Sequence, residues 1–425
     1  MRHEIDLDRL GPAGPPMAQA IERCVHCGFC LPACPTYQEM GEEMDSPRGR
    51  ILLMKEVLEE RLSFQEAAPF VDRCLGCLAC EPACPSGVGY RDLLHGYREI
   101  ARRQEPGPLT ERLRRWLVHS VLPSPSAFRW ALRGARLGAR FSALLPSSWR
   151  PLFVMARGLS WPLPTAEPLP ALEPAQGQRR ARVALLVGCA QEVLEPQITR
   201  SAVRLLARCG VEVVIPPRQG CCGSLALHDG ELERAVKLAA RNLEIFPKDV
   251  DAVLTTAAGC GSGMAEYPAL FARQGLDATA ASALAAKTRD ISDFLAELGL
   301  PEVPPLGRKL IVAYQGACHL EQAQGIRRQP RDLLRLVPNL ELVSLGDGEL
   351  CCGSAGTYNL DQPEMADRLG QRKAEAIMAS GAEAVATGNV GCLVQMRLYL
   401  ERLGGGVPIY HTVEVLDRAY RGELL

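Results

Sequence analysis

Long apolar runs are missing from this sequence. None of its 425 residues lies in an uninterrupted apolar stretch of about 18, the length at which a membrane-spanning helix becomes a candidate. The first residues, MRHEIDLDRLGPAG, carry acids and have no apolar centre, so we expect no secretory signal peptide. We therefore expect a cytoplasmic chain that crosses no membrane.

The chain also has almost no net charge and none of the common catalytic motifs. The formal net charge is −1, so the chain lacks the positive field of most nucleic-acid-binding proteins, and we expect no nucleic-acid partner. No P-loop occurs, and GCGSGM at 259–264 does not complete a dinucleotide fingerprint. No serine–histidine or paired-carboxylate arrangement stands out. We expect no catalytic residue and no substrate site on this chain.

Cysteine, in contrast, is abundant. The chain has 17 cysteines, an odd number, and is far longer than a small disulfide-stapled domain. A hydrophobic content of 47% is enough for several buried cores, and the length suggests two to four domains. In a cytoplasmic chain the thiols stay reduced, and so many reduced thiols indicate bound metal.

Two cysteine runs near the N-terminus have the same spacing. CVHCGFCLPACP and CLGCLACEPACP both follow C-x2-C-x2-C-x3-C-P, the run found in bacterial two-cluster ferredoxins. Three cysteines of a run bind three corners of a [4Fe–4S] cube, and the fourth ligates the other cluster. This rule predicts one cluster on Cys24, Cys27, Cys30 and Cys84, and a second on Cys34, Cys74, Cys77 and Cys80. The alternatives are two zinc knuckles or eight buried thiols.

The segments around these runs have helical periodicity. Apolar residues recur at helical spacing between the runs, in ILLMKEVLEERL, and YRDLLHGYREIARR after Cys84 has a similar pattern. We therefore predict an N-terminal α-helical ferredoxin module over residues 1–110.

The second half of the chain contains an internal repeat. RVALLVGCA resembles LIVAYQGACH, VEVVIPPRQGCCGS resembles LELVSLGDGELCCGS, and DAVLTTAAGCGSG resembles AEAVATGNVGCLVQ. Each copy has a lone cysteine, an adjacent pair and another lone cysteine, which indicates duplication of one structural unit. The first set is Cys189, Cys221, Cys222 and Cys260; the second is Cys318, Cys351, Cys352 and Cys392.

Each of these cysteines follows a short apolar run and precedes a helical pattern, so the copies predict parallel α/β units at 181–305 and 306–425. In such sheets ligands bind beyond the carboxyl ends of the strands, where the four cysteines of a copy would meet. They would be ligands of a further cluster or reactive thiols, unless they only pack strand ends. Cys209 lies outside the pattern and is expected in a core. The fold class is α+β multidomain.

Residues 111–180 form a predicted connector. Residues 112–166 contain no Asp or Glu, but they contain nine arginines and all four tryptophans of the chain. These residues lie in or beside segments with helical periodicity. A proline-rich linker follows. Tryptophan on a basic amphipathic segment suggests docking to a membrane surface or a partner, or else a brace between domains. The tryptophans are Trp116, Trp130, Trp149 and Trp161.

The two cysteine runs, with CCGSAGTY, GCCG and GCAQ, resemble those of the iron–sulfur subunits of flavin-linked dehydrogenases. The chain looks most like the glycolate oxidase (glycolate dehydrogenase) iron–sulfur subunits, within a wider group with two-cluster ferredoxin modules and CCG repeats. This resemblance implies a flavoprotein partner with FAD that oxidises glycolate to glyoxylate. It also implies electron transfer from this chain toward quinone, at the inner face of the cell membrane.

The wider group leaves other functions open. Iron–sulfur subunits for lactate or glycerol 3-phosphate share these motifs, and a thiol–disulfide redox protein could use the same repeats. In the related heterodisulfide reductase subunit each CCG repeat ends in C-x-x-C, whereas the last position here is Gly263 or Gln395.

Overall fold

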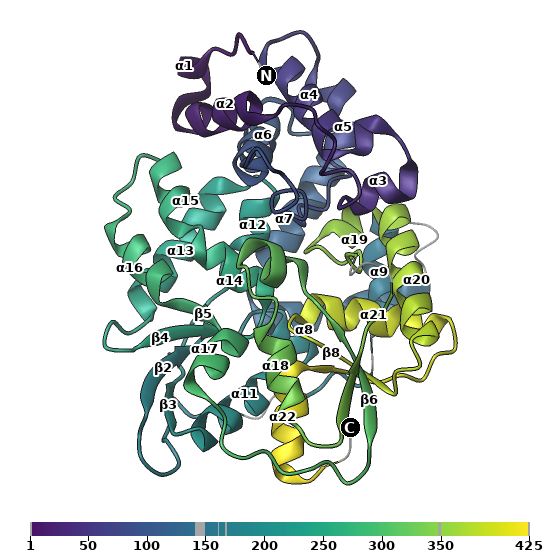
Figure 1. Ribbon diagram of the computed structural model, residues 1–425. Coiled ribbons are helices and arrows are strands. Elements are labelled where there is room, and N and C mark those ends of the chain that lie inside the picture. The colour runs from purple at the N-terminus through teal and green to yellow at the C-terminus, as the bar shows by residue number, and fades with distance from the viewer. Residues whose placement is uncertain (1, 141–148, 160, 166–167, 347–349, 424–425) are drawn as a thin grey trace.

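The computed structural model describes residues 2–140, 149–159, 161–165, 168–346 and 350–423 (Figure 1). Helices dominate the N-terminal module, and its described residues contain no strand. The cysteine runs are loops that join these helices and face one another. The helices are α1 (Leu7–Leu10), α2 (Gly14–Arg23), α3 (Pro35–Met40), α4 (Pro47–Leu58), α5 (Phe64–Val71) and α6 (Tyr90–Gln104). The predicted α-helical module is confirmed.

The first repeat is a mainly parallel sheet in the order β1-β3-β2-β4-β5, with only β1 antiparallel to its neighbour. Its strands are β1 (Leu172–Glu173), β2 (Ala181–Leu185), β3 (Val211–Val214), β4 (Ala252–Thr255) and β5 (Thr288–Asp290). Strand β1 comes from the predicted connector, so residues before 181 also join this sheet. The helices that join them are α10 (Gln191–Leu194), α11 (Pro196–Arg208), α12 (Ser224–His228), α13 (Leu232–Ile245), α14 (Ala258–Ala265), α15 (Tyr267–Arg273), α16 (Thr279–Lys287) and α17 (Ile291–Leu298).

The second repeat has a parallel sheet in the order β7-β6-β8-β9, the counterpart of β3-β2-β4-β5. Its strands are β6 (Leu310–Gln315), β7 (Leu340–Val343), β8 (Ala384–Thr387) and β9 (Ile409–His411). A π-helical turn, η5 (His319–Ala323), precedes α18 (Gln329–Arg335), α19 (Tyr358–Asp361), α20 (Pro363–Ala379), α21 (Val390–Arg402) and α22 (Thr412–Arg421). The predicted duplication of an α/β unit is confirmed.

One glycine in each repeat shows how closely the copies correspond. Gly223 and Gly353, directly after the paired cysteines, have φ values of +85° and +82°, where residues with a side chain are strained. A Cβ on Gly223 would lie 3.2 Å from the carbonyl oxygen of Ala235, and one on Gly353 would lie 2.9 Å from that of Ala366. The CCG motif therefore needs its glycine both for the turn and for the approach of the next helix.

The two repeats share a core. Helix α11 of the first packs against α22 of the second, and α17 packs against α18, so one set of buried apolar side chains extends from sheet to sheet. In Figure 1 the two sheets lie in the lower half and the N-terminal module lies above them. This arrangement directs the cysteine-bearing strand ends toward the N-terminal module.

The connector forms helices α7 (Leu109–Val121), α8 (Pro125–Gly138) and α9 (Arg150–Arg157). Helix α8 contacts α7, α9 and α10, and α9 also contacts α19, so the connector touches both repeats. Part of the helical pattern of the connector, residues 141–148, lies outside the described residues. Within the part of the chain that the structure describes, no helix is long and apolar enough to span a membrane.

Candidate metal centres and the thiol-lined cavity

The first predicted cysteine set surrounds one small cavity. Cys24, Cys27, Cys30 and Cys84 all line it, together with Cys80 from the second run. Cys34 precedes Pro35, the first residue of α3, so the fourth cysteine of the first run turns away from the other three. Burial raises the pKa of Cys30 to about 11 and also raises that of Cys24. The four predicted thiols among these five fit the four-cysteine ligand set of a [4Fe–4S] cluster.

The second set lies between the first and the repeats. Burial is the main cause that raises the pKa of Cys80 well above its usual value, and Cys77, Cys74 and Cys34 add to it. Burial also acts on Cys74, but the charges of Arg50 and Arg98 outweigh it and lower the pKa of that thiol. The structure thus groups Cys34 with the cysteines of the other run, and Cys84 with Cys24 and Cys30.

A buried arginine accompanies the second set, and sequence reasoning missed it. Arg50 is 1% exposed and donates to Phe70 O at 2.7 Å, Thr36 Oγ1 at 2.9 Å and Asp45 Oδ1 at 3.1 Å. Asp45, which is fully buried, also pairs with Arg73. The only sequence signal is the arginine itself, in a helix whose other buried positions are mostly apolar.

The spacing of the thiols differs from that of a single-ion site. Among the described residues, no group of three or more His, Cys, Asp or Glu side chains could hold one metal ion. A cubane cluster has one thiolate at each of four irons, so its ligands stand around a larger body than a single ion does. The eight N-terminal cysteines could therefore hold clusters without forming a site for a lone ion.

Hydrogen bonds connect the four thiols of each repeat into a row. Cys189 contacts Cys221, Cys221 contacts Cys222, and Cys222 contacts Cys260. In the second repeat the order is Cys318, Cys351, Cys352 and Cys392. Hydrogen bonds from Cys221 and then Cys260 lower the pKa of Cys222 well below that of an ordinary thiol. Cys209 is apart from both rows, in the core between the sheet and its helices.

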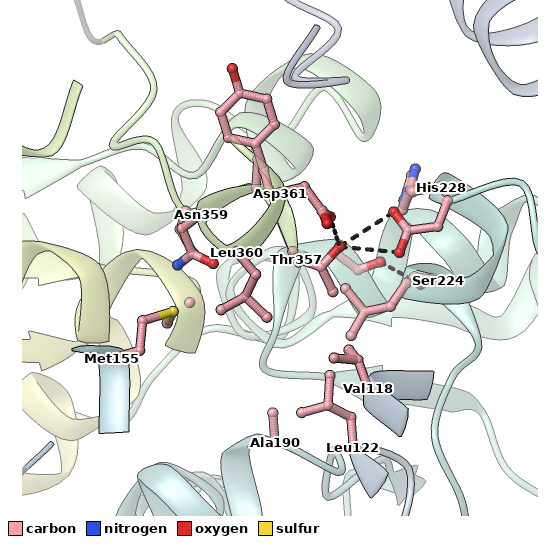
Figure 2. A pocket seen from close by; sticks show the side chains of 18 of the residues that line it. Val118, Leu122, Met155, Ala190, Ser224, His228, Thr357, Asn359, Leu360 and Asp361 are labelled. Atoms are coloured by element: carbon pink, nitrogen blue, oxygen red, sulfur yellow. Dashed lines mark hydrogen bonds between the residues drawn. The ribbon is translucent and has the colours of Figure 1, made fainter. Parts of the chain in front are cut away.

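All eight of these thiols line one cavity of about 870 Å³, which Cys74 of the N-terminal module also reaches. The other walls come from both repeats and from connector helices α7, α8 and α9. Figure 2 shows Val118 and Leu122 of α7 on the side of the pocket opposite Asp361. The connector therefore closes a space that the two repeats and the N-terminal module leave between them.

The polar groups of the cavity gather on one wall. Thr357 Oγ1 donates to Asp229 Oδ2 at 3.1 Å, and Asp361 Oδ2 lies at the same distance from it (Figure 2). His119 Nε2 lies 2.9 Å from Asp229 Oδ2, and Arg114 pairs with Asp361. Burial raises the pKa of Asp361, and the charge of Asp229 adds to this effect. These contacts fix the connector to both repeats.

Three histidines from three parts of the chain meet beside this wall. His95 Nε2 lies 3.1 Å from His228 Nδ1, and the rings of His228 and His319 are 4.9 Å apart. His95 Nδ1 lies 3.2 Å from Glu266 Oε2, and although burial opposes it, His95 lowers the pKa of Glu266 to about 2. Burial lowers the pKa of His319 to about 4. The sequence carried no signal that these histidines and Glu266 meet, because they are distant in the chain.

The two positions that depart from C-x-x-C have different surroundings. A Cβ at Gly263 would overlap the Ser224 hydroxyl, so this site has no room for a fifth cysteine. Gln395 is 2% exposed, lines the cavity, and accepts a hydrogen bond from Asn359 Nδ2 at 3.1 Å. Each repeat therefore presents four thiols, and the second adds an amide.

Comparison with known proteins agrees with this layout. Residues 20–88 match the family described as 4Fe-4S dicluster domain, and residues 183–265 and 312–397 match the one described as Cysteine-rich domain. The probable glycolate oxidase iron-sulfur subunit of Bacillus subtilis (strain 168) is 36% identical over 93% of this chain and 93% of its own length. The glycolate oxidase iron-sulfur subunit of Escherichia coli (strain K12) is 34% identical over 95% of both.

This chain belongs to the family of glycolate oxidase iron–sulfur subunits. The predicted family is confirmed, and so is the order of a dicluster module followed by two cysteine-rich repeats. Another similar protein, the lactate utilization protein A of Exiguobacterium sp. (strain ATCC BAA-1283 / AT1b), is shorter. It is 31% identical over 56% of this chain and 98% of its own length. The two glycolate oxidase subunits, in contrast, match nearly the whole chain.

Proposed function

We propose that this chain is the electron-transfer iron–sulfur subunit of a flavin-linked glycolate oxidase, or glycolate dehydrogenase. A partner flavoprotein with FAD would oxidise glycolate to glyoxylate, and electrons would leave this chain toward quinone. Relatives named as iron–sulfur subunits of glycolate oxidase over nearly the whole length support this assignment. We assign no substrate site to this chain.

The residues that hold the cofactors are assigned in three groups. One [4Fe–4S] cluster is assigned to Cys24, Cys27, Cys30 and Cys84, and a second to Cys34, Cys74, Cys77 and Cys80. When bound, such clusters accept and release electrons one at a time. The eight thiols of the repeats are assigned to a further redox site, either as cluster ligands or as reactive thiols.

The observation that carries the proposal is the continuity of thiols through the molecule. Cys80 borders the cavity of the first set and interacts with Cys77 and Cys74 of the second. Cys77 in turn interacts electrostatically with Cys318 and Cys351 of the second repeat. A protein that only stored or sensed metal would not need three adjoining cysteine sites that connect the N-terminal module to the repeats.

In this proposal each part of the chain has its own role. Residues 1–110 form the cluster module, 111–180 the connector, and 181–305 and 306–425 the two repeats. The connector exposes large apolar side chains beside arginines, including Trp116 and Trp130, which are 58% and 70% exposed. We assign this surface to the inner face of the cell membrane, because tryptophan and arginine together suit the boundary between lipid and water.

The test is affinity purification of the tagged full chain under anaerobic conditions, followed by flavin analysis of the partners. The complex is then assayed with glycolate, lactate and glycerol 3-phosphate and a dye acceptor. Co-purification of a flavoprotein and activity with glycolate above the other two substrates support the proposal. Absence of a flavin-containing partner would overturn it.

Lactate is the second candidate substrate. The similarity to a lactate utilization protein A covers 98% of that protein, so the shared motifs alone do not separate the two hydroxyacids. Glycolate is preferred because the glycolate oxidase subunits match 93% and 95% of this chain, whereas the lactate utilization protein A matches 56%. Preference for lactate in the assay above would change the substrate and leave the electron-transfer role intact.

A further inference from the structure

The large cavity combines reactive, apolar and polar walls. Its volume of about 870 Å³ is in the range of sites for small organic ligands. Cysteines of both repeats form one part, and apolar side chains of the connector, such as Val118, Leu122 and Phe128, form another. A ligand that fits must be largely apolar, carry a few polar atoms, and accept electrons beside thiols.

Four hydrogen-bond donors of residues that line the cavity have no partner among the described residues. Two are the Nε atoms of Arg114 and Arg115, whose guanidinium groups are already bound through their other nitrogens to Leu360, Asp361 and Pro106.

The remaining two donors belong to a histidine and a glutamine. One is Nε2 of His228, whose other ring nitrogen contacts His95. The other is Nε2 of Gln395, whose amide oxygen is taken by Asn359. Buried donors of this kind are rare in native structures, because each unmet donor costs about 1–3 kcal/mol. In Figure 2, His228 and Asn359, the hydrogen-bond partner of Gln395, lie on opposite sides of Thr357.

We propose that this cavity binds a quinone, with one carbonyl oxygen accepting from His228 Nε2 and the other from Gln395 Nε2. A quinone has two carbonyl oxygens on opposite sides of a flat apolar ring, which suits two donors beside the apolar side chains that the connector adds to the cavity. The inference rests on the proposed function, which supplies the electrons from hydroxyacid oxidation on the partner flavoprotein.

The histidine pair also provides a route for protons. Reduction of a quinone to a hydroquinone takes up two electrons and two protons, so a buried site needs a proton supply. His228 gives the proton on Nε2 to the carbonyl oxygen, forming an O–H bond, and takes another at Nδ1 from Nε2 of His95. Glu266 holds the other side of His95 and pairs with the partly exposed Arg91 at 3.3 Å, which places this end of the route near solvent. The route supplies the one proton of this oxygen, and with two electrons the bound product is the hydroquinone monoanion. Its second oxygen takes up a proton from water when the product leaves, and His95 regains its proton from water at the outer end of the route.

Binding is tested first, on the full chain, with a short-tailed ubiquinone analogue that carries a photoreactive azide. We expect adducts on peptides of the cavity wall, and about five-fold weaker binding in Gln395→Met, which loses one donor at similar volume. Ala135→Trp, on the cavity-facing side of α8, should abolish labelling. Ala280→Trp is the matched control, because this alanine is on exposed α16 away from the cavity. Labelling of Ala135→Trp at the wild-type level would overturn the site.

Proton transfer is tested in the complex with two acceptors. Quinone takes protons, whereas ferricyanide takes one electron and no proton. We expect His95→Gln and His228→Gln to slow glycolate-dependent quinone reduction about 100-fold and to slow ferricyanide reduction much less. Equal loss with both acceptors, or no loss with either, would overturn the route. If flavin is not reduced by any hydroxyacid, the proposed function fails instead, and photolabelling still reports on the cavity.

Discussion

The Nη1 atom of Arg50 lies 3.8 Å from the sulfur of Cys34, inside a cage where every other partner of the guanidinium is an oxygen. A buried positive charge beside a cluster ligand stabilises the more negative, reduced state, and hydrogen bonds to the sulfurs act in the same direction. Arg50→Gln should therefore lower the reduction potential of the cluster assigned to Cys34, Cys74, Cys77 and Cys80. The expected change is on the order of 60 mV, which for one electron equals about 1.4 kcal/mol.

Potentiometric titration followed by electron paramagnetic resonance measures this change. Arg50→Lys keeps the charge but cannot donate to all three oxygen acceptors of Arg50, so its shift in reduction potential should be smaller than that of Arg50→Gln. Arg103→Gln, with an arginine side chain that is 64% exposed, is the control and should leave both potentials unchanged. Removal of Arg50 also leaves Asp45 with one fewer partner, so a loss of stability of about 3–5 kcal/mol is expected. Equal potentials in Arg50→Gln and wild type would contradict the assigned role.

The crossed arrangement of the N-terminal cysteines gives a second prediction. Cys84 belongs by sequence to the second run, but it lines the small cavity with Cys24, Cys27 and Cys30. Cys84→Ser should therefore damage the cluster of the first run and leave the other one intact. Cys77→Ser is the matched variant and should do the reverse. Spectra that lose the Cys74–Cys77–Cys80 signal in Cys84→Ser would refute the crossing.

Spacing along the chain was enough to predict the cluster module and the duplicated α/β unit. The C-x2-C-x2-C-x3-C-P runs and the CCG pairs carry their geometry locally, since the glycine after each pair is dictated by the turn and by the next helix. The same local logic predicted that Cys209, outside the pattern, would be in a core, which its 1% exposure confirms.

Contacts between distant segments could not be predicted in this way. His95 and His228 are 133 positions apart, and Arg114 and Asp361 are 247 apart. Neither pair is marked by a motif, because each residue alone is an ordinary polar side chain on a helix. Arg50 was missed for a related reason: its burial depends on how α4 packs near Thr36 of α3 and Phe70 of α5, and periodicity does not report this packing.

The connector combines a brace with an exposed basic surface, and the two roles separate by residue. Arg129 donates to Pro164 O at 2.7 Å and Glu192 O at 2.8 Å, so Arg129→Gln should lower stability by about 1.5–3 kcal/mol, measured as a lower Tm. Arg112, Arg133 and Arg140 are exposed, and replacing these three with Gln should leave Tm unchanged.

The triple variant should instead reduce recovery of the chain in the membrane fraction. Exposed charges are screened by salt, so wild-type recovery should fall at high ionic strength and the variant should be less sensitive to it. Sedimentation at several salt concentrations checks both effects. Sedimentation of the triple variant like wild type at every concentration would leave the connector with a bracing role alone.

The final prediction concerns the paired cysteines of the repeats. Cys221 and Cys351 occupy the same place in the two thiol rows, and both line the large cavity. If they only filled space, replacement with alanine would remove one sulfur atom and cost about 1 kcal/mol, with turnover intact. Cys209→Ala is the matched control for this cost, because Cys209 is buried in the core away from the cavity.

We expect Cys221→Ala and Cys351→Ala to fold and to bind the flavoprotein like Cys209→Ala. Glycolate should still reduce the flavin in each complex, because that step precedes electron transfer to this chain. Quinone reduction should fail in Cys221→Ala and Cys351→Ala and continue in Cys209→Ala. Only the first two variants interrupt a row of thiols that lines the large cavity. Stopped-flow absorbance of the flavin and of the quinone in one experiment separates these steps. Wild-type rates for both steps in Cys221→Ala and Cys351→Ala would show that the pairs are structural and that electrons leave the chain from the N-terminal module.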